Sequence, residues 1–471
     1  MINPGKPSTM TASAIGVLAP LALSMLLGSL GISIANVALP ALALAFSAPF
    51  PAVQWVVIAY LLASTVTIVA LGRLGDQIGH RRVLLGGIAL FGFASLLCSL
   101  AGDLRVLILA RVVQGIGAAI LMALTVALVR DTVPRDRMGR AMGLLGTMSA
   151  IGTALGPSLG GVLIGAFGWR AIFLAMIPLS GLNFLLVRRL LPRNTSAAGH
   201  DGGFDIAGML LLGLSLGAYA LAMTINDGRL DGLNVTLLLC ALGAGIAFVA
   251  VEKRAPSPLI RIAALGDPVL ASGLATSALV GAVMMTTFVV GPFYLARSLG
   301  LSMVEVGAVM AVGPLVSMIS GVPAGGIVDR LGAAPVIRLG LATMALGAFG
   351  LAILSGRYGV TGYLGAMVVL TPGYQLFQAA NSTLVMTDAG AEQRGVISGL
   401  LALSRNLGLL TGASLMGAVF TQASGVSDIA NAGSIELAAG MRITFLVAAA
   451  LMVVALAITF STGKFRGRSR L

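Results

Sequence analysis

The stretch Gly72-Arg-Leu-Gly75-Asp76-Gln-Ile-Gly79-His-Arg81-Arg82 separates two long apolar runs, at 52–71 and 83–101. A related stretch, Gly325-Gly-Ile-Val-Asp329-Arg330-Leu-Gly332, follows at an offset of 253, with Gly, Asp and Gly at matching positions. A second pair links Gly156-Pro-Ser-Leu-Gly-Gly161 with Gly412-Ala-Ser-Leu-Met-Gly417 at an offset of 256. Parallel repeats of this length predict two related six-helix halves with a central site between them.

The composition indicates a membrane protein. Of 471 residues, 58% are hydrophobic and 10% are charged, and the mean hydropathy is +1.02. The 63 glycines suit close helix packing in lipid. The net charge of +13 does not indicate a nucleic-acid partner, because the basic residues fall in short clusters between apolar runs. Cys98 and Cys240 both lie in apolar runs, so no disulfide framework is expected.

Apolar runs of about 20 residues, the length that crosses a bilayer, recur along the whole chain. We therefore predict an all-α polytopic membrane protein with fourteen spans. The predicted spans are 13–44, 52–71, 83–101, 105–130, 139–164, 169–188, 205–223, 234–252, 268–296, 304–327, 336–355, 359–386, 392–421 and 441–461. They divide into an N-terminal six-helix bundle at 1–190, two additional helices with linkers at 191–262, and a C-terminal six-helix bundle at 263–471.

The basic residues predict the orientation of these spans. With the N-terminus in the cytoplasm, 21 of the 29 Lys and Arg residues fall in cytoplasmic segments and six fall outside. Arg111 and Arg405 lie within spans. Cytoplasmic loops of membrane proteins carry such an excess of Lys and Arg. The bias therefore favours an even number of spans with both termini in the cytoplasm, since thirteen spans would place the basic C-terminal tail outside.

The stretch from Gly72 to Arg82 resembles the cytoplasmic signature loop of the major facilitator superfamily. Its glycines permit a tight turn, its aspartate can cap a helix or pair with an arginine, and its last arginines can anchor at the anionic leaflet. A plain positively charged loop would explain one copy, but not the second copy that ends at Gly332. The resemblance implies a conformational-switch role for Gly72, Arg73, Gly75, Asp76, Gly79, Arg81, Arg82, Asp329 and Arg330.

The predicted span 105–130 contains Arg111-Val-Val-Gln114-Gly115, which resembles a second motif of the superfamily. A charge at the centre of a membrane helix costs about 2.5–3.5 kcal/mol on insertion scales, so Arg111 should face the protein interior and be paired. Gln114 lies one turn along the same helix face. The resemblance implies a role in proton coupling for Arg111, Gln114 and Gly115. The alternative is that Arg111 lies near the outer end of its span and reaches the headgroups.

The predicted span 139–164 carries a stripe of small residues, Gly152, Gly156 and Gly160, followed by Gly161. Within it, Pro157 lacks a backbone donor and should kink the helix. The pattern resembles the motif of the exporting antiporter branches, although ordinary packing of small residues is the alternative. Together with the stretches 30–40 and 53–62, it points to the fourteen-span drug:proton antiporter branch of multidrug efflux proteins.

One position departs from the pattern of that branch. An acidic residue usually follows the leucine at position 30, but here the residue is Gly31. None of the sixteen acidic residues is placed at mid-membrane by the predicted spans, and His80 and His200 both fall in predicted loops. The usual membrane-embedded proton carrier is therefore missing. Proton coupling would then use Arg111, a loop acid such as Asp76 or another group, or it is absent.

The polar and sulfur-bearing residues within spans are candidates for a substrate cavity. These candidates are Asn36, Gln54, Tyr60, Met284, Tyr294, Tyr374, Gln375, Gln378, Asn381 and Arg405. Gln375, Gln378 and Asn381 recur at helical spacing after Pro372-Gly373, which favours a water-lined face. Interhelical hydrogen bonds explain each of these residues equally well. Arg405 is the stronger candidate because an unpaired arginine within a span is costly. Methionines such as Met284 adapt to varied apolar substrates.

These patterns predict a secondary active transporter that exports small amphipathic compounds, such as drugs and biocides, from a bacterial cytoplasm across the plasma membrane. The proton gradient is the expected energy source, and no cofactor or metal is expected. A dedicated metabolite exporter, or a uniporter without proton coupling, is the alternative. An intramembrane enzyme would need paired acids, a Ser–His dyad or metal ligands, and none lies within the predicted spans. A sensor or scaffold would need a larger soluble domain than the predicted loops provide. We expect a monomer whose partners are the lipid bilayer and small molecules.

Overall fold

The computed structural model describes residues 12–133, 138–192, 205–228, 231–255, 266–387, 393–425 and 433–468, and these residues are helical apart from short connections. The helices are α1 (Ala12–Ala45), α2 (Phe50–Ile78), α3 (His80–Leu100), α4 (Leu104–Thr132), α5 (Met138–Phe167), α6 (Arg170–Leu174), α7 (Met176–Leu190), α8 (Ile206–Thr224), η2 (Ile225–Gly228), α9 (Gly232–Glu252), α10 (Pro268–Phe293), η4 (Tyr294–Ser298), α11 (Met303–Leu331), α12 (Ala333–Thr387), α13 (Gln393–Ser424) and α14 (Ser434–Arg468). The expected all-α membrane fold is confirmed, because thirteen helices in the described part of the chain are long and apolar enough to cross a membrane.

Helix α12 has 55 residues, and a straight helix of that length would be about 80 Å long, far more than the roughly 30 Å hydrocarbon core. The chain instead folds back at Gly359, which has φ 57° and ψ −129°. The two arms then pack closely, since a Cβ atom at Gly347 would lie 2.6 Å from Leu370 Cα and one at Gly340 would lie 2.7 Å from Phe377 N. The arms coincide with the predicted spans 336–355 and 359–386.

The predicted span 169–188 is interrupted in the structure. Helix α6 ends at Leu174 and α7 begins at Met176, and together they form one apolar span, Arg170–Leu190, in agreement with the predicted span. Pro178 explains the break, because it has no N–H to donate to the carbonyl of residue 174.

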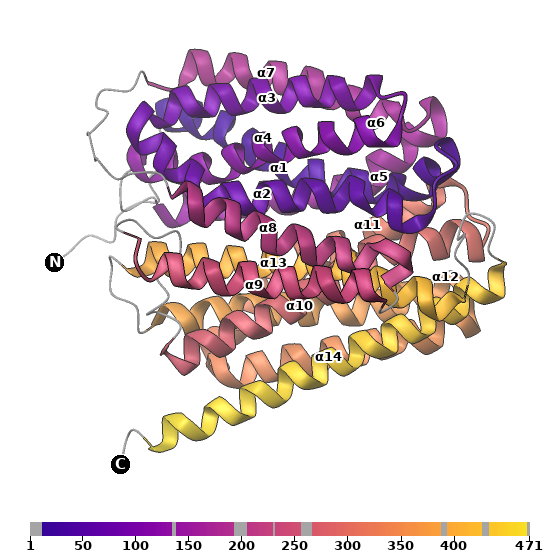
Figure 1. Ribbon diagram of the computed structural model, residues 1–471. Coiled ribbons are helices and arrows are strands. Elements are labelled where there is room, and N and C mark those ends of the chain that lie inside the picture. The colour runs from indigo at the N-terminus through magenta and orange to yellow at the C-terminus, as the bar shows by residue number, and fades with distance from the viewer. Residues whose placement is uncertain are drawn as a thin grey trace.

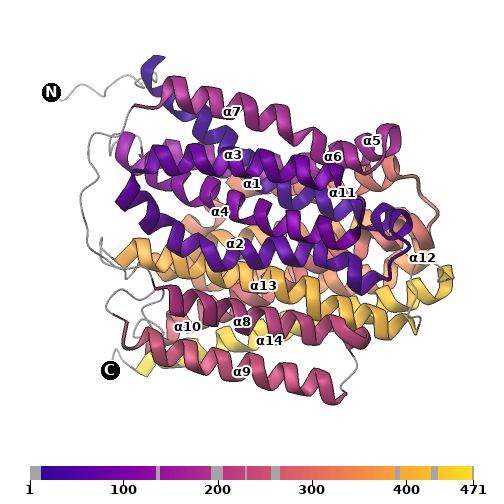
Figure 2. The ribbon, with the colours of Figure 1, turned by 45° about the horizontal axis from the view of Figure 1, so that its top comes forward.

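The helices form two bundles with a hairpin beside them (Figure 1). Helices α1–α7 pack together in one bundle, and α10–α14 form the other. Helices α8 and α9 pair with each other, and α8 lies along α2 and α13, as Figure 2 also shows. We call the end where α1 begins and α14 ends the terminal face, and the end where α1 ends and α2 begins the far face.

The first pair of repeated stretches forms the same turn in each bundle. Gly79, between α2 and α3, has φ 103°, and Gly332, between α11 and α12, has φ 82°. The N–H of Gly79 donates to Gly75 O and the N–H of Gly332 donates to Val328 O, both at 2.8 Å. A positive φ at this position requires glycine, which is why glycine ends both stretches.

The second pair of repeated stretches forms equivalent helix contacts. In the first bundle, α5 packs on α1, and a Cβ atom at Gly156 would lie 2.8 Å from Ile34 N. In the second bundle, α13 packs on α10, and a Cβ atom at Gly412 would lie 2.7 Å from Met285 Cβ. Both glycines therefore allow two helix backbones to approach more closely than any larger residue would.

The α8–α9 hairpin is tied to the first bundle and capped at its turn. The indole Nε1–H of Trp55 on α2 donates to Thr224 Oγ1 at the end of α8, at 3.0 Å. The carboxylate of Asp231 accepts from the N–H of Asn234 at 2.9 Å and from the amide of Asn226 at 2.5 Å. These bonds hold the pKa of Asp231 below its usual value, because they stabilise the charged form.

Candidate functional site

The two bundles meet through backbone contact at the far face. Helix α5 of the first bundle crosses α11 of the second at Gly161 and Gly307, whose Cα atoms are close enough that a Cβ on either would lie 2.9 Å from the other. A Cβ at Gly161 would also lie 2.5 Å from Met303 O. No side chain fits between the two helices at this point.

Helices α2 and α13 make the second contact between the bundles, also toward the far face. The Gln54 amide on α2 donates to Ala413 O on α13 at 2.9 Å. The Phe50 ring meets the rings of Phe293 and Phe420 edge-on, with centroids 4.7 and 5.4 Å away. Both of these contacts lie in the halves of their helices that are nearer the far face.

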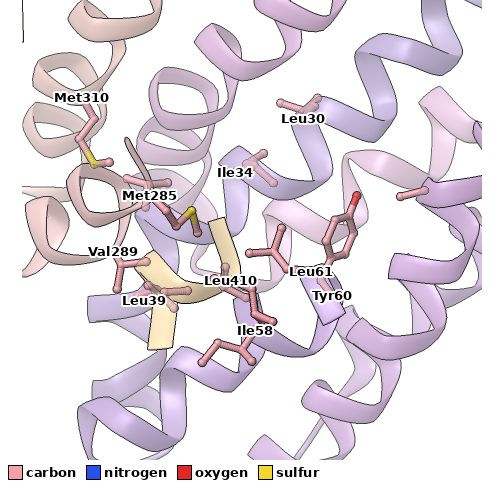
Figure 3. Packing of buried hydrophobic residues seen from close by; sticks show 14 of the residues in the cluster. Leu30, Ile34, Leu39, Ile58, Tyr60, Leu61, Met285, Val289, Met310 and Leu410 are labelled. Carbon is pink, nitrogen blue, oxygen red and sulfur yellow. The ribbon is translucent and has the colours of Figure 1, made fainter. Parts of the chain in front are cut away.

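The two contacts between the bundles together form a seal at the far face. Next to this seal, apolar side chains from four helices fill the space between the bundles. Figure 3 shows Leu39 of α1 and Ile58 of α2 beside Val289 of α10 and Leu410 of α13, so each bundle contributes two helices. All four side chains are buried. The closure is therefore dry and apolar, and it separates the centre of the protein from the far face.

A cavity of about 160 Å³ lies between the bundles. Helices α1, α4 and α5 of the first bundle and α10–α13 of the second supply its walls. Its lining combines methionines and Phe288 with hydroxyl and amide groups and one charge. The lining residues are Ser29, Ile32, Ser33, Asn36, Met122, Ser149, Thr153, Met284, Met285, Thr287, Phe288, Met310, Gly313, Pro314, Ser317, Tyr363, Met367, Thr371, Tyr374, Arg405 and Leu409. Among these described residues, Arg405 is the single charged side chain.

Four of the predicted cavity residues lie in this lining, namely Asn36, Met284, Tyr374 and Arg405. The carbonyl oxygen of the Asn36 side chain and Nε of Arg405 are buried and have no hydrogen-bond partner among the described residues. The two groups come from opposite bundles, on α1 and α13. Two residues of the lining therefore each carry a polar atom that no described residue satisfies.

The other predicted cavity residues lie elsewhere. Gln54 is in the seal, and the hydroxyl of Tyr294 donates to Ser355 O at 2.8 Å within the second bundle. On α12, the Gln375 amide donates to the cavity residue Ser317, and the Asn381 amide donates to Gly273 O at 3.1 Å. Gln378 is half-buried and does not line the cavity, and Tyr60 lies beside Arg111. The interhelical explanation thus fits Gln375 and Asn381.

The serine residues of the lining, together with Thr153 and Thr371, were not predicted from the sequence. Ser29 and Ser149 approach through their hydroxyl oxygens at 2.6 Å, and Ser33 donates to Gly152 O at 3.1 Å, so they join α1 to α5. Together with Asn36, Ser29 and Ser33 are spaced four and three residues apart. That one-sided polar spacing was the available signal.

Arg111 is fully buried, so it does not reach the headgroups. Its Nε donates to Val56 O at 2.8 Å, and one terminal nitrogen donates to Gly31 O at 3.1 Å and to Gln114 Oε1 at 2.5 Å. Its guanidinium lies 4.2 Å from the centroid of the Tyr60 ring. Within the described part of the chain, carbonyl oxygens and an aromatic face surround this charge, and no carboxylate pairs with it.

Position 31 adjoins this buried charge. A Cβ atom at Gly31 would lie 3.1 Å from Tyr60 Oη and from the ring of Phe91. The backbone carbonyl of Gly31, rather than a side-chain carboxylate, accepts from Arg111. Gly115, one residue after Gln114, lets α4 approach α2, since a Cβ there would lie 2.5 Å from Tyr60 O.

The predicted switch loop ties three helix ends together at the terminal face. A terminal nitrogen of Arg81 donates to Arg188 O at the end of α7, at 2.7 Å. His80 Nδ1 lies 2.7 Å from a carboxylate oxygen of Asp131 at the end of α4. The surroundings of Gly72 and the side chains of Arg73 and Asp76 lie outside what the structure describes. The side chains of Arg82, Asp329 and Arg330 are exposed.

Two helical bundles around a central cavity, with repeated turns at one face, define a polytopic membrane protein built from two related halves. The chain belongs to the Major Facilitator Superfamily, whose family model matches residues 21–413. The expected superfamily is therefore confirmed.

Relatives with similar sequences carry several transport names. The chain is 34% identical to YebQ of Escherichia coli, an uncharacterized transporter, over 83% of this chain and 85% of that protein. It is 29% identical to the riboflavin transporter RibZ of Clostridioides difficile, over 86% and 88%, and 31% identical to the multidrug resistance protein Stp of Mycobacterium tuberculosis, over 82% and 72%. The fold matches that of the xylose transporter XylE of E. coli, with a TM-score of 0.66 and 13% identity over 96% of this chain and 98% of that one.

Proposed function

We propose that this chain is a secondary active exporter of small amphipathic compounds in the bacterial plasma membrane. The cavity between the bundles carries this proposal, because methionine and aromatic walls with a few polar groups suit apolar molecules of varied shape. The relative Stp is a multidrug resistance protein, which supports the same direction. Drugs and biocides are the substrates to test first.

The proposal places the chain in the fourteen-span drug:proton antiporter branch, with both termini in the cytoplasm. Counting the two arms of α12 separately supports fourteen spans, and the excess of basic residues supports a cytoplasmic terminal face. The units are then the bundle at 1–190, the two additional helices at 191–262 and the bundle at 263–471. With the terminal face in the cytoplasm, the sealed far face is the outer one. The working unit is a monomer.

Proton antiport is the proposed energy source. Arg111, Gln114 and Gly115 form the candidate coupling group, and Gly152, Gly156, Pro157, Gly160 and Gly161 form the candidate antiporter stripe. The stripe holds α5 against α1 within one bundle and against α11 across the seal. Alternating access must preserve the first contact and break the second. The loop stretches that end at Gly79 and Gly332 are the proposed switch turns.

A dedicated metabolite exporter without proton coupling is the second candidate. The similarity to the riboflavin transporter RibZ covers a larger share of RibZ than the similarity to Stp covers of Stp. This similarity favours the second candidate. The presence of Gly31 where the drug antiporter branch has an acid favours it too.

Transport by the purified full chain in proteoliposomes tests the proposal. Ethidium, the anionic dye fluorescein and riboflavin are followed with and without an imposed pH gradient. Gradient-driven movement of either dye supports drug antiport, whereas riboflavin movement that ignores the gradient supports the second candidate. The Gly156→Leu variant, which fills the contact between α5 and α1, is the inactive control, and Gly143→Leu on the same helix is its match, because nothing lies within 4 Å of a Cβ atom there.

A further inference from the structure

The cavity contains one positive charge and, among its described lining residues, no acid to balance it. The Arg405 side chain makes no hydrogen bond or ion pair with any described residue, and its Nε is buried. A guanidinium in a membrane protein normally faces a carboxylate, backbone carbonyls or water, because isolation from all three is costly. Arg111 in the same fold shows the usual solution, with three acceptor oxygens around it.

Asn36 presents an unused amide from the opposite side of the same cavity. The residue is 1% exposed, its Oδ1 has no partner, and its amide makes no hydrogen bond to any described residue. Buried amides are almost always hydrogen-bonded in native proteins. Asn36 on α1 and Arg405 on α13 therefore line one cavity from different bundles, and each carries a buried polar atom without a partner among the described residues.

We propose that Arg405 and Asn36 form an anion subsite that selects amphipathic organic acids. The carboxylate of such a substrate pairs with Arg405, and a hydroxyl or N–H on its body donates to Asn36. The apolar part of the substrate lies against Phe288, Met285 and Met310, which line the same cavity. This inference rests on the proposed export function and specifies its substrate class.

The local physics favours anions over cations at this position. Walls of methionine and aromatic side chains lower the effective dielectric constant, so a single guanidinium acts more strongly than it would in water. A bound carboxylate gains this attraction, and a permanent cation meets the corresponding repulsion. A substrate that contacts both Arg405 and Asn36 also bridges the two bundles.

Two dyes with the same tricyclic ring system make a matched pair of probes. Fluorescein is an anion at pH 8 and carries a carboxylate, while rhodamine 123 is a cation whose carboxyl group is esterified. Binding to the purified full chain in lipid nanodiscs is measured by fluorescence anisotropy at pH 8. We expect fluorescein to bind at least about tenfold more tightly, in line with the effect of unpairing a buried charge.

Substitutions at the two positions should reverse this preference. Arg405→Gln should weaken fluorescein binding about tenfold or more and strengthen rhodamine 123 binding, because both the attraction and the repulsion are removed. Arg405→Lys should keep part of the preference, and Asn36→Asp should act like Arg405→Gln by placing a negative charge opposite the arginine. The control is Arg357→Gln, which removes a cation from the exposed turn of α12 outside the cavity lining.

The outcomes separate the subsite from the transport function. A variant that fails to fold loses both dyes, whereas the subsite predicts opposite changes for the two. Unchanged fluorescein binding in Arg405→Gln, or equal binding of both dyes to the parent protein, would overturn the subsite. Selective fluorescein binding without transport in proteoliposomes would keep the subsite and overturn export. Transport of rhodamine 123 alone would keep export and overturn the subsite.

Discussion

The substitution Gly161→Ala should open the far face of the transporter. An added Cβ atom would lie 2.5 Å from Met303 O and 2.9 Å from Gly307 Cα. Both neighbours are backbone atoms that cannot rotate away, so α5 and α11 must separate. Overpacking of this kind costs about 1–3 kcal/mol, and only in the conformation in which the far face is closed. The helix-propensity gain of about 0.5–1 kcal/mol applies to both conformations and cancels. A cost of about 2 kcal/mol corresponds to a shift of roughly thirtyfold in the conformational equilibrium.

Pulsed electron paramagnetic resonance between two spin labels measures this shift. The labels are attached at Gly102→Cys, between α3 and α4, and at Tyr358→Cys, on the turn of α12, and both sites lie at the far face. The native Cys98 and Cys240 are first replaced by serine. Gly161→Ala should move the distance distribution toward longer values.

The matched control is Gly143→Ala on the same helix, where nothing lies within 4 Å of an added Cβ atom. This variant should leave the distances as they are in the parent protein. If Gly161→Ala gives the same distribution as Gly143→Ala, the close contact of α5 and α11 does not hold the far face shut.

Four further substitutions test the repeated turn, the buried arginine and the contact between α2 and α13. Gly79→Ala should lower the free energy of unfolding by about 1–3 kcal/mol, because φ at this position is 103°. Gly332→Ala should have a similar effect. Unchanged thermal unfolding of these variants in detergent would contradict the shared turn. Arg111→Lys should abolish pH-driven transport, because one ammonium cannot reach the three acceptors of the guanidinium, and proteoliposomes with an imposed gradient measure this. Gln54→Ala should favour opening by about 0.5–1.5 kcal/mol, since it removes the side-chain hydrogen bond that joins α2 to Ala413 O on α13, and the same spin-label distance should lengthen.

The helices and their repeat could be predicted because lipid imposes simple rules on sequence. Long apolar runs had to form helices, and glycines at matching positions marked the turns at Gly79 and Gly332. The burial of Arg111 followed from the cost of a charge in the membrane. The break before Pro178 was readable in principle, but the apolar run around it concealed the interruption.

The lining of the cavity could be predicted only in part. Hydropathy does not report how far each helix rotates about its axis, and the docking of two distant bundles decides which polar groups face the centre. Gln54 therefore reached the seal and Asn381 reached a carbonyl of α10, although both looked like cavity residues. Ser29 and Ser33 gave little signal, because serines in membrane helices commonly bond to their own backbone.

The hairpin of α8 and α9 makes the two flanks of the transporter unequal. On one flank, α8 lies along α2 and α13, with Gly213 and Gly217 packed on Val66 and Leu62 of α2. Amphipathic molecules concentrate in the membrane itself, and a molecule diffusing in the leaflet meets α8 on that flank instead of the seam. The seam between α5 and α11 has no such cover from the hairpin in the described part of the chain. In the described part of the chain, the hairpin therefore covers one of the two seams between the bundles and leaves the other uncovered.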